Sequence, residues 1–426
     1  MKAVLLSAGK GQRLEPLTST RPKHLIKVAG KPILQFCLDA VKAAGITDII
    51  IVVHYMGDKI RDYFGDGTSQ GLKISYVEQK ELLGTGNAVM AAEQYVDEKF
   101  VLIYGDLLFA QDAVKRAVNL YEEAKPEAVI TAVRVEVPEN YGVIDVMEGK
   151  KLGCIIEKPQ AGKASSNLVS AGIHVFSRVI FEKMMCIKKS VRGEVELTDA
   201  LAMFASEGKT VLVVELDRNA WFDVGRPCNL LDANRWALKH LEPQTLGTIE
   251  QGVHLIGSVH VAKTARIRSG VYIEGPVFVD EGADVGPNCF IHSGTSIGKK
   301  VRVGNAVEIE NSLIMDNTHI GHLSYIRDSI IGENCDIGAG AITTNIRFDY
   351  GKIKMIVRNK KVDTGKHKLG AILGDNVKTG INASFMSNVK VGTNTWIGPN
   401  YMVVHDIPKN SSYTSKKTRK YTKKEI

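Results

Sequence analysis

Apolar positions in the first 240 residues fall into short runs separated by stretches with helical spacing. Five runs are rich in Val and Ile, as buried parallel strands are: KAVLLSA, DIIIVVH, KFVLIYGD, AVITAVRV and TVLVVEL. Between the first two lies KPILQFCLDAVKAAG, which has helical periodicity and ends on Gly45, a residue type that often terminates helices. This alternation predicts a doubly wound α/β domain, which we place at residues 1–243.

From residue 248 onward the apolar pattern has a different period. An aliphatic residue occupies every sixth position from Ile249 to Ile309, and the repeat resumes at Leu373 and continues to Val403. Side chains six apart can point inward and stack on their counterparts one coil away, at a spacing of ~4.8 Å. Hexapeptide periodicity predicts a parallel β-helix, here over residues 248–409. We expect residues 410–426 to form a basic, mobile tail.

The six-residue spacing slips after Ile309, close to a His and a Tyr that are three residues apart. Residues 320–326 read IGHLSYI, with His322 and Tyr325 inside the disturbed stretch. The repeat by itself leaves two interpretations open: a degenerate part of a scaffold, or a functional site.

The net charge of +8 is concentrated in two segments. Residues 347–368 carry a net charge of +6 and residues 411–426 a net charge of +5, so the rest of the chain is slightly acidic. This distribution argues against a nucleic-acid-binding face. No apolar run approaches the ~20 residues that cross a bilayer. The six cysteines are scattered without paired spacing, which favours reduced thiols in a cytoplasmic protein and argues against a metal cluster.

The first predicted strand runs into a Gly-rich turn followed by two cations. In LSAGKGQRLEPLTSTRPK, the glycines allow backbone N–H groups to approach phosphates. Arg13 and Lys23 add positive charge that suits a triphosphate, whose transition state spreads charge over its oxygens. The spacing matches neither a Walker A motif nor GxGxxG.

This stretch resembles the signature of the sugar-1-phosphate nucleotidylyltransferases, close to LxAGxGTRLxPxTxxxPK. It departs at Gln12, where Thr is usual, and at His24, where Pro is common. Further elements of that family follow in order: EQKELLGTGNA, YGD, NYGV, IEKP, ELTDA and WFDVGRP.

The resemblance implies roles for the matching residues. Arg13 and Lys23 would neutralise the nucleotide phosphates and the departing pyrophosphate, and Asp106 and Asp223 would hold Mg²⁺, which prefers oxygen ligands. The implied nucleotide-binding residues are Ala8, Gly9, Gly11, Gln79, Gly84 and Thr85, of which the last three would read the pyrimidine edge. The implied sugar-phosphate ligands are Gly142, Glu157 and Lys158. The nucleophile is the substrate's own phosphate, so positioning and charge neutralisation suffice.

The second half resembles the hexapeptide acyltransferases, which are left-handed parallel β-helices and usually trimers. The combination of halves resembles the archaeal-type bifunctional enzymes that acetylate glucosamine 1-phosphate and uridylylate the product. That family carries GHLxY and GAGTxTxN where this chain has GHLSY and GAGAITTN. The resemblance favours a functional site at residues 320–326. It implies His322 as general base, Tyr325, Asn345 and Lys354 as sugar-phosphate ligands, and Ala339 against the thioester of acetyl-CoA.

Three positions depart from the family pattern in the implied acceptor pocket. His292 stands where Arg is usual, Glu310 where Lys is usual, and Asp336 where Asn is usual. Because all three changes disfavour an anionic sugar phosphate, we hypothesise that acetylation is weak or that its acceptor has changed. Ser170 falls where relatives with N-acetylated substrates often have Asn, which blurs the sugar preference.

The predicted function is therefore bifunctional. The first reaction transfers a nucleotidyl group from UTP or dTTP to a sugar 1-phosphate, with N-acetylglucosamine 1-phosphate favoured over glucose 1-phosphate. The second transfers acetyl from acetyl-CoA to an amino-sugar 1-phosphate. Two alternatives stay open: a nucleotidylyltransferase whose β-helix only oligomerises, and a non-catalytic regulatory subunit. We expect a homotrimer or a multiple of it, with no nucleic-acid or membrane partner.

Overall fold

The computed structural model describes residues 1–358, 360–414 and 419–420. The chain forms two compact units. Unit 1 comprises Met1–Lys10 and Ile33–Asp223, and unit 2 comprises Gly11–Pro32 and Val224–Ile426. The segment from Gly11 to Pro32, which carries Arg13 and Lys23, therefore packs with the C-terminal half.

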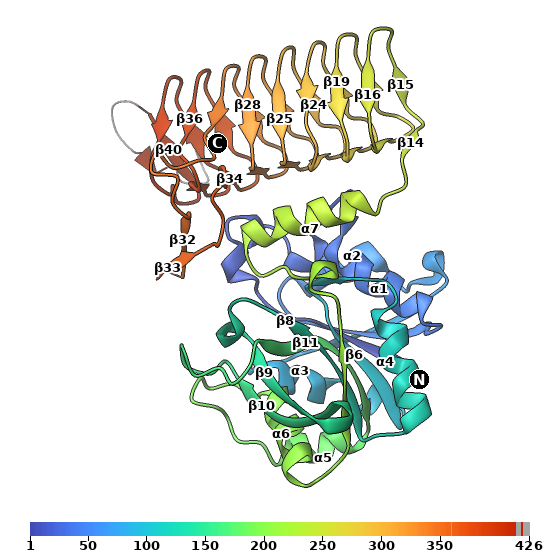
Figure 1. Cartoon of the computed structure of the whole chain (residues 1–426). Coiled ribbons are helices and arrows are strands. Elements are labelled where there is room, and N and C mark those ends of the chain that lie inside the picture. The colour runs from blue at the N-terminus through green and yellow to red at the C-terminus, as the bar shows by residue number, and fades with distance from the viewer. Residues whose placement is uncertain (359, 415–418, 421–426) are drawn as a thin grey trace. The chain divides into compact units, whose positions relative to one another are not determined.

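Unit 1 is built on a nine-stranded sheet with helices on both faces (Figure 1). The strand order is β5-β4-β1-β6-β11-β8-β12-β10-β9, and the first four strands are parallel. The strands are β1 (Lys2–Ser7), β4 (Asp48–Val53), β5 (Lys73–Glu78), β6 (Lys99–Tyr104), β8 (Ala128–Arg134), β9 (Gly142–Met147), β10 (Lys151–Glu157), β11 (Leu168–Ser177) and β12 (Val211–Glu215). A separate ribbon pairs β7 (Leu107–Phe109) with β13 (Trp221–Asp223).

The helices of unit 1 pack in two groups. Helices α1 (Ile33–Ala43) and α4 (Ala113–Ala124) contact each other, and α3 (Thr85–Ala91), α5 (Val179–Met185) and α6 (Leu197–Ser206) contact one another. Helix α2 (Gly57–Phe64) connects β4 to β5. The Val- and Ile-rich strands are buried between these groups, as the sequence predicts for a doubly wound domain.

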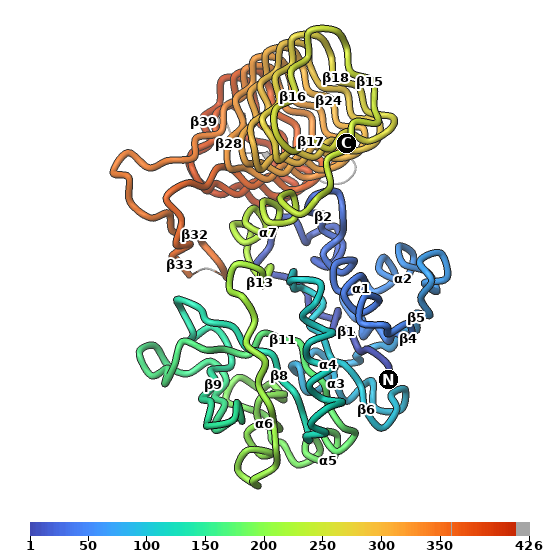
Figure 2. The backbone as a smooth tube through the Cα atoms, turned by 45° about the vertical axis from the view of Figure 1, so that its right-hand side comes forward, coloured from blue at the N-terminus to red at the C-terminus, as the bar shows by residue number. Residues whose placement is uncertain are grey.

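In unit 2, residues 244–413 form a left-handed parallel β-helix of three sheets (Figures 1 and 2). One sheet contains β14 (Gln244–Thr245), β17 (Val259–Val261), β20 (Val277–Val279), β23 (Thr295–Ile297), β26 (Leu313–Ile314), β29 (Ile330–Ile331), β34 (Ile372–Leu373) and β37 (Lys390–Val391). A second contains β15 (Thr248–Ile249), β18 (Arg266–Ile267), β21 (Asp284–Val285), β24 (Arg302–Val303), β27 (His319–Ile320), β30 (Asp336–Ile337), β35 (Lys378–Thr379), β38 (Trp396–Ile397), β40 (Ser411–Tyr413) and β41 (Arg419–Lys420). The third contains β16 (His254–Ile256), β19 (Tyr272–Glu274), β22 (Phe290–Ile291), β25 (Glu308–Glu310), β28 (Tyr325–Arg327), β31 (Ile342–Thr343), β36 (Ser384–Phe385) and β39 (Met402–Val403).

The hexapeptide positions form the core of the β-helix. Strand registers pair Ile267 with Val285 and Ile291 with Ile309, so one coil takes 18 residues, or three repeats. Most of the aliphatic positions in the repeat are fully buried in one continuous core. The stacking predicted from the six-residue period is therefore confirmed.

The six-residue spacing slips after Ile309, as the sequence indicated, but it is not lost within residues 320–326. The inward positions are five residues apart at Ile309–Ile314 and again at Ile326–Ile331, whereas Ile320 and Ile326 keep the regular six. Residues 320–326 are thus an intact rung, and our interpretation of a break there was wrong. One residue is lost at each of two stacked corners, those of Asn311 and Asp328, where both residues take left-handed backbone conformations and the Asn311 amide donates to Asp328.

The only described insertion longer than a few residues in the coils follows Asn345. It forms the hairpin of β32 (Lys354–Val357) and β33 (Lys360–Asp363), which projects from the β-helix (Figure 2). At the C-terminus, β40 pairs with β38, so regular structure extends past the predicted limit of 409. Most of the predicted mobile tail, residues 415–418 and 421–426, lies outside the described residues.

Unit 2 also contains helix α7 (Pro227–Lys239), short 3-10 turns at Gln12–Leu14, Leu17–Ser19 and Lys23–Leu25, and the strand pair β2 (Lys27–Val28) and β3 (Lys31–Pro32). No helix in the described part of the chain is both long and apolar enough to cross a membrane. All six cysteines are free thiols, and four of them are buried.

Candidate active sites

The Gly-rich turn follows β1, an interior strand of the sheet of unit 1. β1 lies between β4 and β6, so the direction of strand progression reverses around it, and ligands bind at such switch points in α/β sheets. Ala8 is buried, and its carbonyl accepts the N–H of Tyr55 from the end of β4. Gly9 follows directly. The predicted phosphate-binding turn is therefore located where the fold favours a ligand.

The predicted base-reading residues lie together after β5. Gln79 is buried, and its amide nitrogen donates to the Gly84 carbonyl at 3.3 Å and to Asn87 Oδ1 at 2.8 Å. Thr85 begins α3 immediately after Gly84. Both amide hydrogens of Gln79 are thereby committed to the protein, and its oxygen is the atom that can accept a base N–H. Sequence reasoning did not single out Asn87, which fixes this orientation.

The two predicted metal ligands are brought together by the β7–β13 ribbon. Asp223 pairs with Leu107, the residue directly after Asp106. Asp106 lies near Tyr104, whose hydroxyl pKa is raised by burial and by nearby charges that include Asp106. Within the described residues, no group of three or more His, Cys, Asp and Glu is arranged to hold a metal. Two carboxylates fit Mg²⁺ only if substrate phosphates and water complete its shell.

A cavity of about 380 Å³ lies beside the predicted sugar-phosphate ligands. Glu157 Oε1 is 3.1 Å from Lys158 Nζ and 3.7 Å from Arg192. A side chain at Gly142 would begin 3.1 Å from Glu157 Oε2, so the glycine keeps that carboxylate accessible. Lys158 has a left-handed backbone (φ 44°), a strained conformation that is common at functional sites.

Sequence reasoning missed Arg192, which lines the same cavity. Its guanidinium bonds to the buried Glu196 at 2.6 Å. Burial raises the pKa of the neighbouring Asp199, and Glu196 raises it further. Glu196 begins the ELTDA motif that carried the family resemblance, but Arg192 lies in a stretch with no recognisable pattern.

In unit 2, the two predicted phosphate-binding cations rest on glycines. The guanidinium of Arg13 is held against Gly225, where an added Cβ would meet its atoms at 2.9–3.2 Å. The side chain of Lys23 packs against Gly11 in the same way. Thr18 closes the turn by donating its hydroxyl to the Gly11 carbonyl at 3.0 Å. Gly225 is another residue that sequence reasoning missed, although it belongs to the WFDVGRP motif.

His322 lies at a corner of the β-helix between β27 and β28, and its side chain is exposed in the single chain. Its Nδ1 accepts the backbone N–H of Asn305 at 2.7 Å. Since a backbone N–H can only donate, the neutral ring carries its proton on Nε2. In this orientation Nε2 donates, and the ring must give up the Asn305 bond before Nε2 can accept a proton.

Ala339 and Tyr325 are close to this corner. Ala339 occupies the equivalent corner one coil further, and the adjacent Gly340 N–H donates to the His322 carbonyl at 2.8 Å. Tyr325 begins β28, and the guanidinium of Arg327 lies over its ring at 5.0 Å. The structure thus places His322, Tyr325 and the backbone of Ala339 close together, three of the residues predicted for acetyl transfer.

Asn345 and Lys354 are placed elsewhere on the same chain. The Asn345 side chain is buried at the corner beyond β31, and its Nδ2 donates to Asp328 at 2.6 Å. That bond gives Asn345 a structural role in one chain, in place of direct contact with His322. Lys354 lies on the projecting hairpin, where its carbonyl accepts the Asn388 amide at 3.0 Å.

Two of the three departures from the family pattern are neighbours, and the third is not. His292 Nε2 lies 3.0 Å from Glu308 Oε1, and Glu310 forms an ion pair with Arg327. Asp336 lies on a different sheet, where it contacts His319 at 3.2 Å. Within a single chain a corner of the β-helix separates the two sheets, and our expectation that all three residues surround one pocket stays a prediction.

Comparison with known proteins connects these sites to a family. Residues 2–240 match the family model of nucleotidyl transferases, and residues 273–382 match the GMPPB C-terminal domain. A bifunctional protein GlmU of Methanocaldococcus jannaschii is 43% identical over 96% of this chain and 97% of its own. A bifunctional sugar-1-phosphate nucleotidylyltransferase/acetyltransferase of Sulfurisphaera tokodaii is 38% identical over 96% of this chain and 98% of its own.

A solved UDP-glucose pyrophosphorylase in complex with UDP-glucose matches with a TM-score of 0.51 and 25% identity. It covers 56% of this chain and 99% of the other. The likeness to the bifunctional proteins spans both the α/β half and the β-helix. The chain belongs to the nucleotidyl transferase family and, over nearly its whole length, to its bifunctional GlmU-type branch.

Proposed function

We propose that this protein transfers a nucleotidyl group from UTP or dTTP to a sugar 1-phosphate and transfers acetyl from acetyl-CoA to an amino-sugar 1-phosphate. The observation that carries the first activity is the joint placement of the Gly-rich turn after β1 and the paired carboxylates at Asp106 and Asp223. The likeness to bifunctional relatives over both halves supports the combination.

In the first reaction, a phosphate oxygen of the sugar 1-phosphate attacks the α-phosphorus of the nucleotide and pyrophosphate leaves. Arg13 and Lys23 neutralise charge on the phosphates, which is the main demand of phosphoryl-type transfer. Asp106 and Asp223 would hold Mg²⁺, which supplies further neutralisation of the phosphate oxygens. Lys158 and Arg192 provide the positive charge for the acceptor phosphate beside the cavity of unit 1.

The base-binding residues bear on which nucleotide and which sugar phosphate are the substrates. The Gln79 oxygen accepts the N3–H that uracil and thymine share, so the contact favours a pyrimidine without choosing between UTP and dTTP. N-acetylglucosamine 1-phosphate is the favoured acceptor, and glucose 1-phosphate stays possible.

A pyrophosphate-release assay with both nucleotides and both sugar phosphates tests this activity. Robust release with one pair, lost about 100-fold in Arg13→Gln, is expected. No release with any pair, with Mg²⁺ present, would overturn the proposal.

For the second reaction, His322 takes the proton of the attacking amine after leaving its Asn305 bond, and Ala339 lies against the thioester. The outer surface of β25 and β28 is acidic, because Glu308 and Glu310 accompany His292 and Arg327 there. This supports the hypothesis that acetylation of glucosamine 1-phosphate is weak or that the acceptor differs.

Release of the CoA thiol, with glucosamine 1-phosphate and uncharged amino sugars as acceptors, tests the second reaction. The expected result is slow transfer to glucosamine 1-phosphate that His322→Ala abolishes. Transfer at ordinary rates would refute the altered acceptor site, and thiol release unaffected by His322→Ala would refute the role of the histidine. A cytoplasmic homotrimer assembled through the β-helix completes the proposal, and its molar mass by light scattering checks the assembly.

A further inference from the structure

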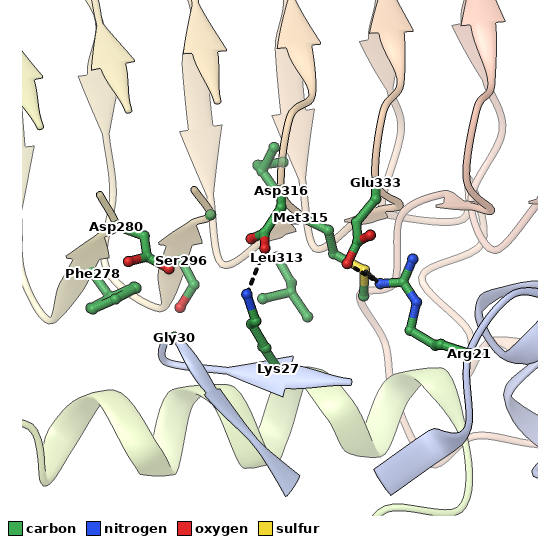
Figure 3. Close-up of a pocket in the computed structure, with 12 residues that line it drawn as sticks. Arg21, Lys27, Gly30, Phe278, Asp280, Ser296, Leu313, Met315, Asp316 and Glu333 are labelled. Carbon is green, nitrogen blue, oxygen red and sulfur yellow. Dashed lines mark hydrogen bonds and ion pairs between the residues drawn. The ribbon is translucent and has the colours of Figure 1, made fainter. Parts of the chain in front are cut away.

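The segment Gly11–Pro32 is attached to the β-helix by charged side chains that the proposed chemistry does not use. Figure 3 shows Arg21 and Lys27 of this segment reaching acidic residues on successive coils. Between them in sequence lies Lys23, and ten residues before Lys23 lies Arg13. The attachment therefore brackets a proposed catalytic cation.

The strongest contact is made by Arg21, which is only 8% exposed. One of its terminal nitrogens bonds to Glu333 Oε1 at 2.6 Å and the other forms an ion pair with Asp375. Asp375 is 4% exposed, and it also accepts the hydroxyl of Thr20 and the Glu333 N–H at 2.8 Å. Each oxygen of this buried carboxylate therefore has a partner.

A second group of contacts holds the far end of the segment. Lys27 Nζ lies 2.5 Å from Asp316 Oδ2. Gly30 packs directly under the ring of Phe278, where an added Cβ would lie 2.3 Å from the ring. The segment is thus fixed both two residues before Lys23 and four residues after it.

Stability alone is a poor explanation for such contacts. A buried ion pair gains little net free energy, because desolvation of both charges offsets their attraction. Its geometry is nevertheless strict, since breaking it leaves a buried charge without a partner. Pro22 joins Arg21 to Lys23 with a fixed φ of −68°, so the orientation of the arginine constrains the backbone of the lysine.

We propose that Asp375 and Glu333 are positioning residues for nucleotidyl transfer, which act through Arg21 to hold Lys23 and Arg13 in their productive places. The inference rests on the proposed nucleotidyl transfer and adds to it a task for the β-helix. The β-helix then takes part in the first reaction by positioning two of its cations.

The test uses Asp375→Asn, Arg21→Gln and the double variant in the full-length protein. The matched control is Asp284→Asn, which removes the Arg268–Asp284 ion pair of the β-helix without touching the segment. Steady-state pyrophosphate release gives kcat and KM for the nucleotide at 25 °C, and circular dichroism gives the melting temperature. Both single variants are expected to lose about tenfold in kcat/KM, because a displacement of Lys23 and Arg13 by less than 1 Å is enough to lower the rate by that amount.

The double variant should lose no more than either single variant, because all three break the same link. Unchanged kcat/KM with a lowered melting temperature would show a purely structural role and overturn the inference. Multiplying losses in the double variant, or an equal loss in Asp284→Asn, would overturn it as well. If Asp375→Asn does not fold, Glu333→Gln takes its place with a smaller expected loss in the same direction, and no loss there is again a refutation. An inactive wild type would refute the proposed function itself, a result distinct from an active wild type whose variants are unimpaired.

Discussion

Replacing Gly225 with Ala should impair nucleotidyl transfer without weakening the fold. The new methyl group would lie 2.9 Å from one terminal nitrogen of Arg13, 3.0 Å from its central carbon and 3.2 Å from the other nitrogen. All three atoms belong to the end of a flexible side chain, so the guanidinium can move away at little cost in folding free energy.

The size of the effect follows from the displacement. Ordinary contacts of a Cβ atom begin near 3.4 Å, so Arg13 has to shift by about 0.5 Å. Misplacement of a reacting group by 1 Å can cost about 100-fold in rate. Half that distance corresponds to about tenfold in kcat/KM, or ~1.4 kcal/mol of lost transition-state stabilisation.

The assay is pyrophosphate release at varied nucleotide concentration, with thermal unfolding measured in parallel. Gly398→Ala is the matched control, because its Cβ would meet only ordinary contacts at 3.4 Å or more. It should match the wild type in rate and in melting temperature. We expect Gly225→Ala to have a lower kcat/KM. Its melting temperature should stay within about 2 °C of the wild type, which corresponds to a change below ~0.5 kcal/mol in the free energy of unfolding.

Wild-type kcat/KM in Gly225→Ala would refute the reasoning, since the guanidinium would then tolerate its displacement. A large fall in melting temperature would also contradict it, because the clash would have been absorbed by the backbone.

Three further predictions concern two buried groups and one exposed histidine. Asn234 is fully buried and forms hydrogen bonds with the Ala29 N–H, the Ser296 hydroxyl and a backbone carbonyl. At ~1 kcal/mol per lost hydrogen bond, Asn234→Ala should lower the free energy of unfolding by about 3 kcal/mol, which denaturant titration measures. Burial raises the pKa of the Asp280 carboxyl in the folded protein above its value of ~3.9 in the unfolded chain. Ionisation of Asp280 therefore lowers the free energy of unfolding: the loss is complete above the raised pKa and absent below ~3.9. Asp280→Asn should thus melt higher than the wild type at pH 7, and the difference should close towards pH 4; an unchanged gap across this range contradicts the assignment. For His322, ¹⁵N NMR of the free protein should show the tautomer protonated on Nε2, and a proton on Nδ1 would exclude the Asn305 hydrogen bond.

Much of the architecture could be predicted because local patterns repeat. The six-residue period needs no knowledge of distant contacts, since each coil buries the same positions against the next. The Gly-rich turn was recognisable because a phosphate cradle requires glycines directly after a strand. Gln79, Asp106 and Glu157 were found through motifs, and the structure brings each next to a predicted companion in unit 1.

Other features depend on contacts that no sequence pattern predicts. We associated the slip in the repeat with residues 320–326, but one residue is lost at each of the corners of Asn311 and Asp328, because a corner can shorten without disturbing the strand before it. Asp336 was grouped with His292 and Glu310, although a fold in the coil puts it on another sheet. Arg192 had no sequence signal, because its role comes only from the cavity it lines.

The sequence by itself determined the two periods, hence the two architectures, and the residue types of both candidate sites. It could do so because burial is periodic along strands, helices and coils. Only the tertiary structure decided that Arg13 packs against Gly225 and that the ring of His322 faces the Asn305 N–H. It also decided that Arg21 binds Glu333 and Asp375, which lie 312 and 354 residues further along the chain. Such contacts join side chains that are distant in sequence, and their partners are selected by three-dimensional packing rather than by spacing along the chain.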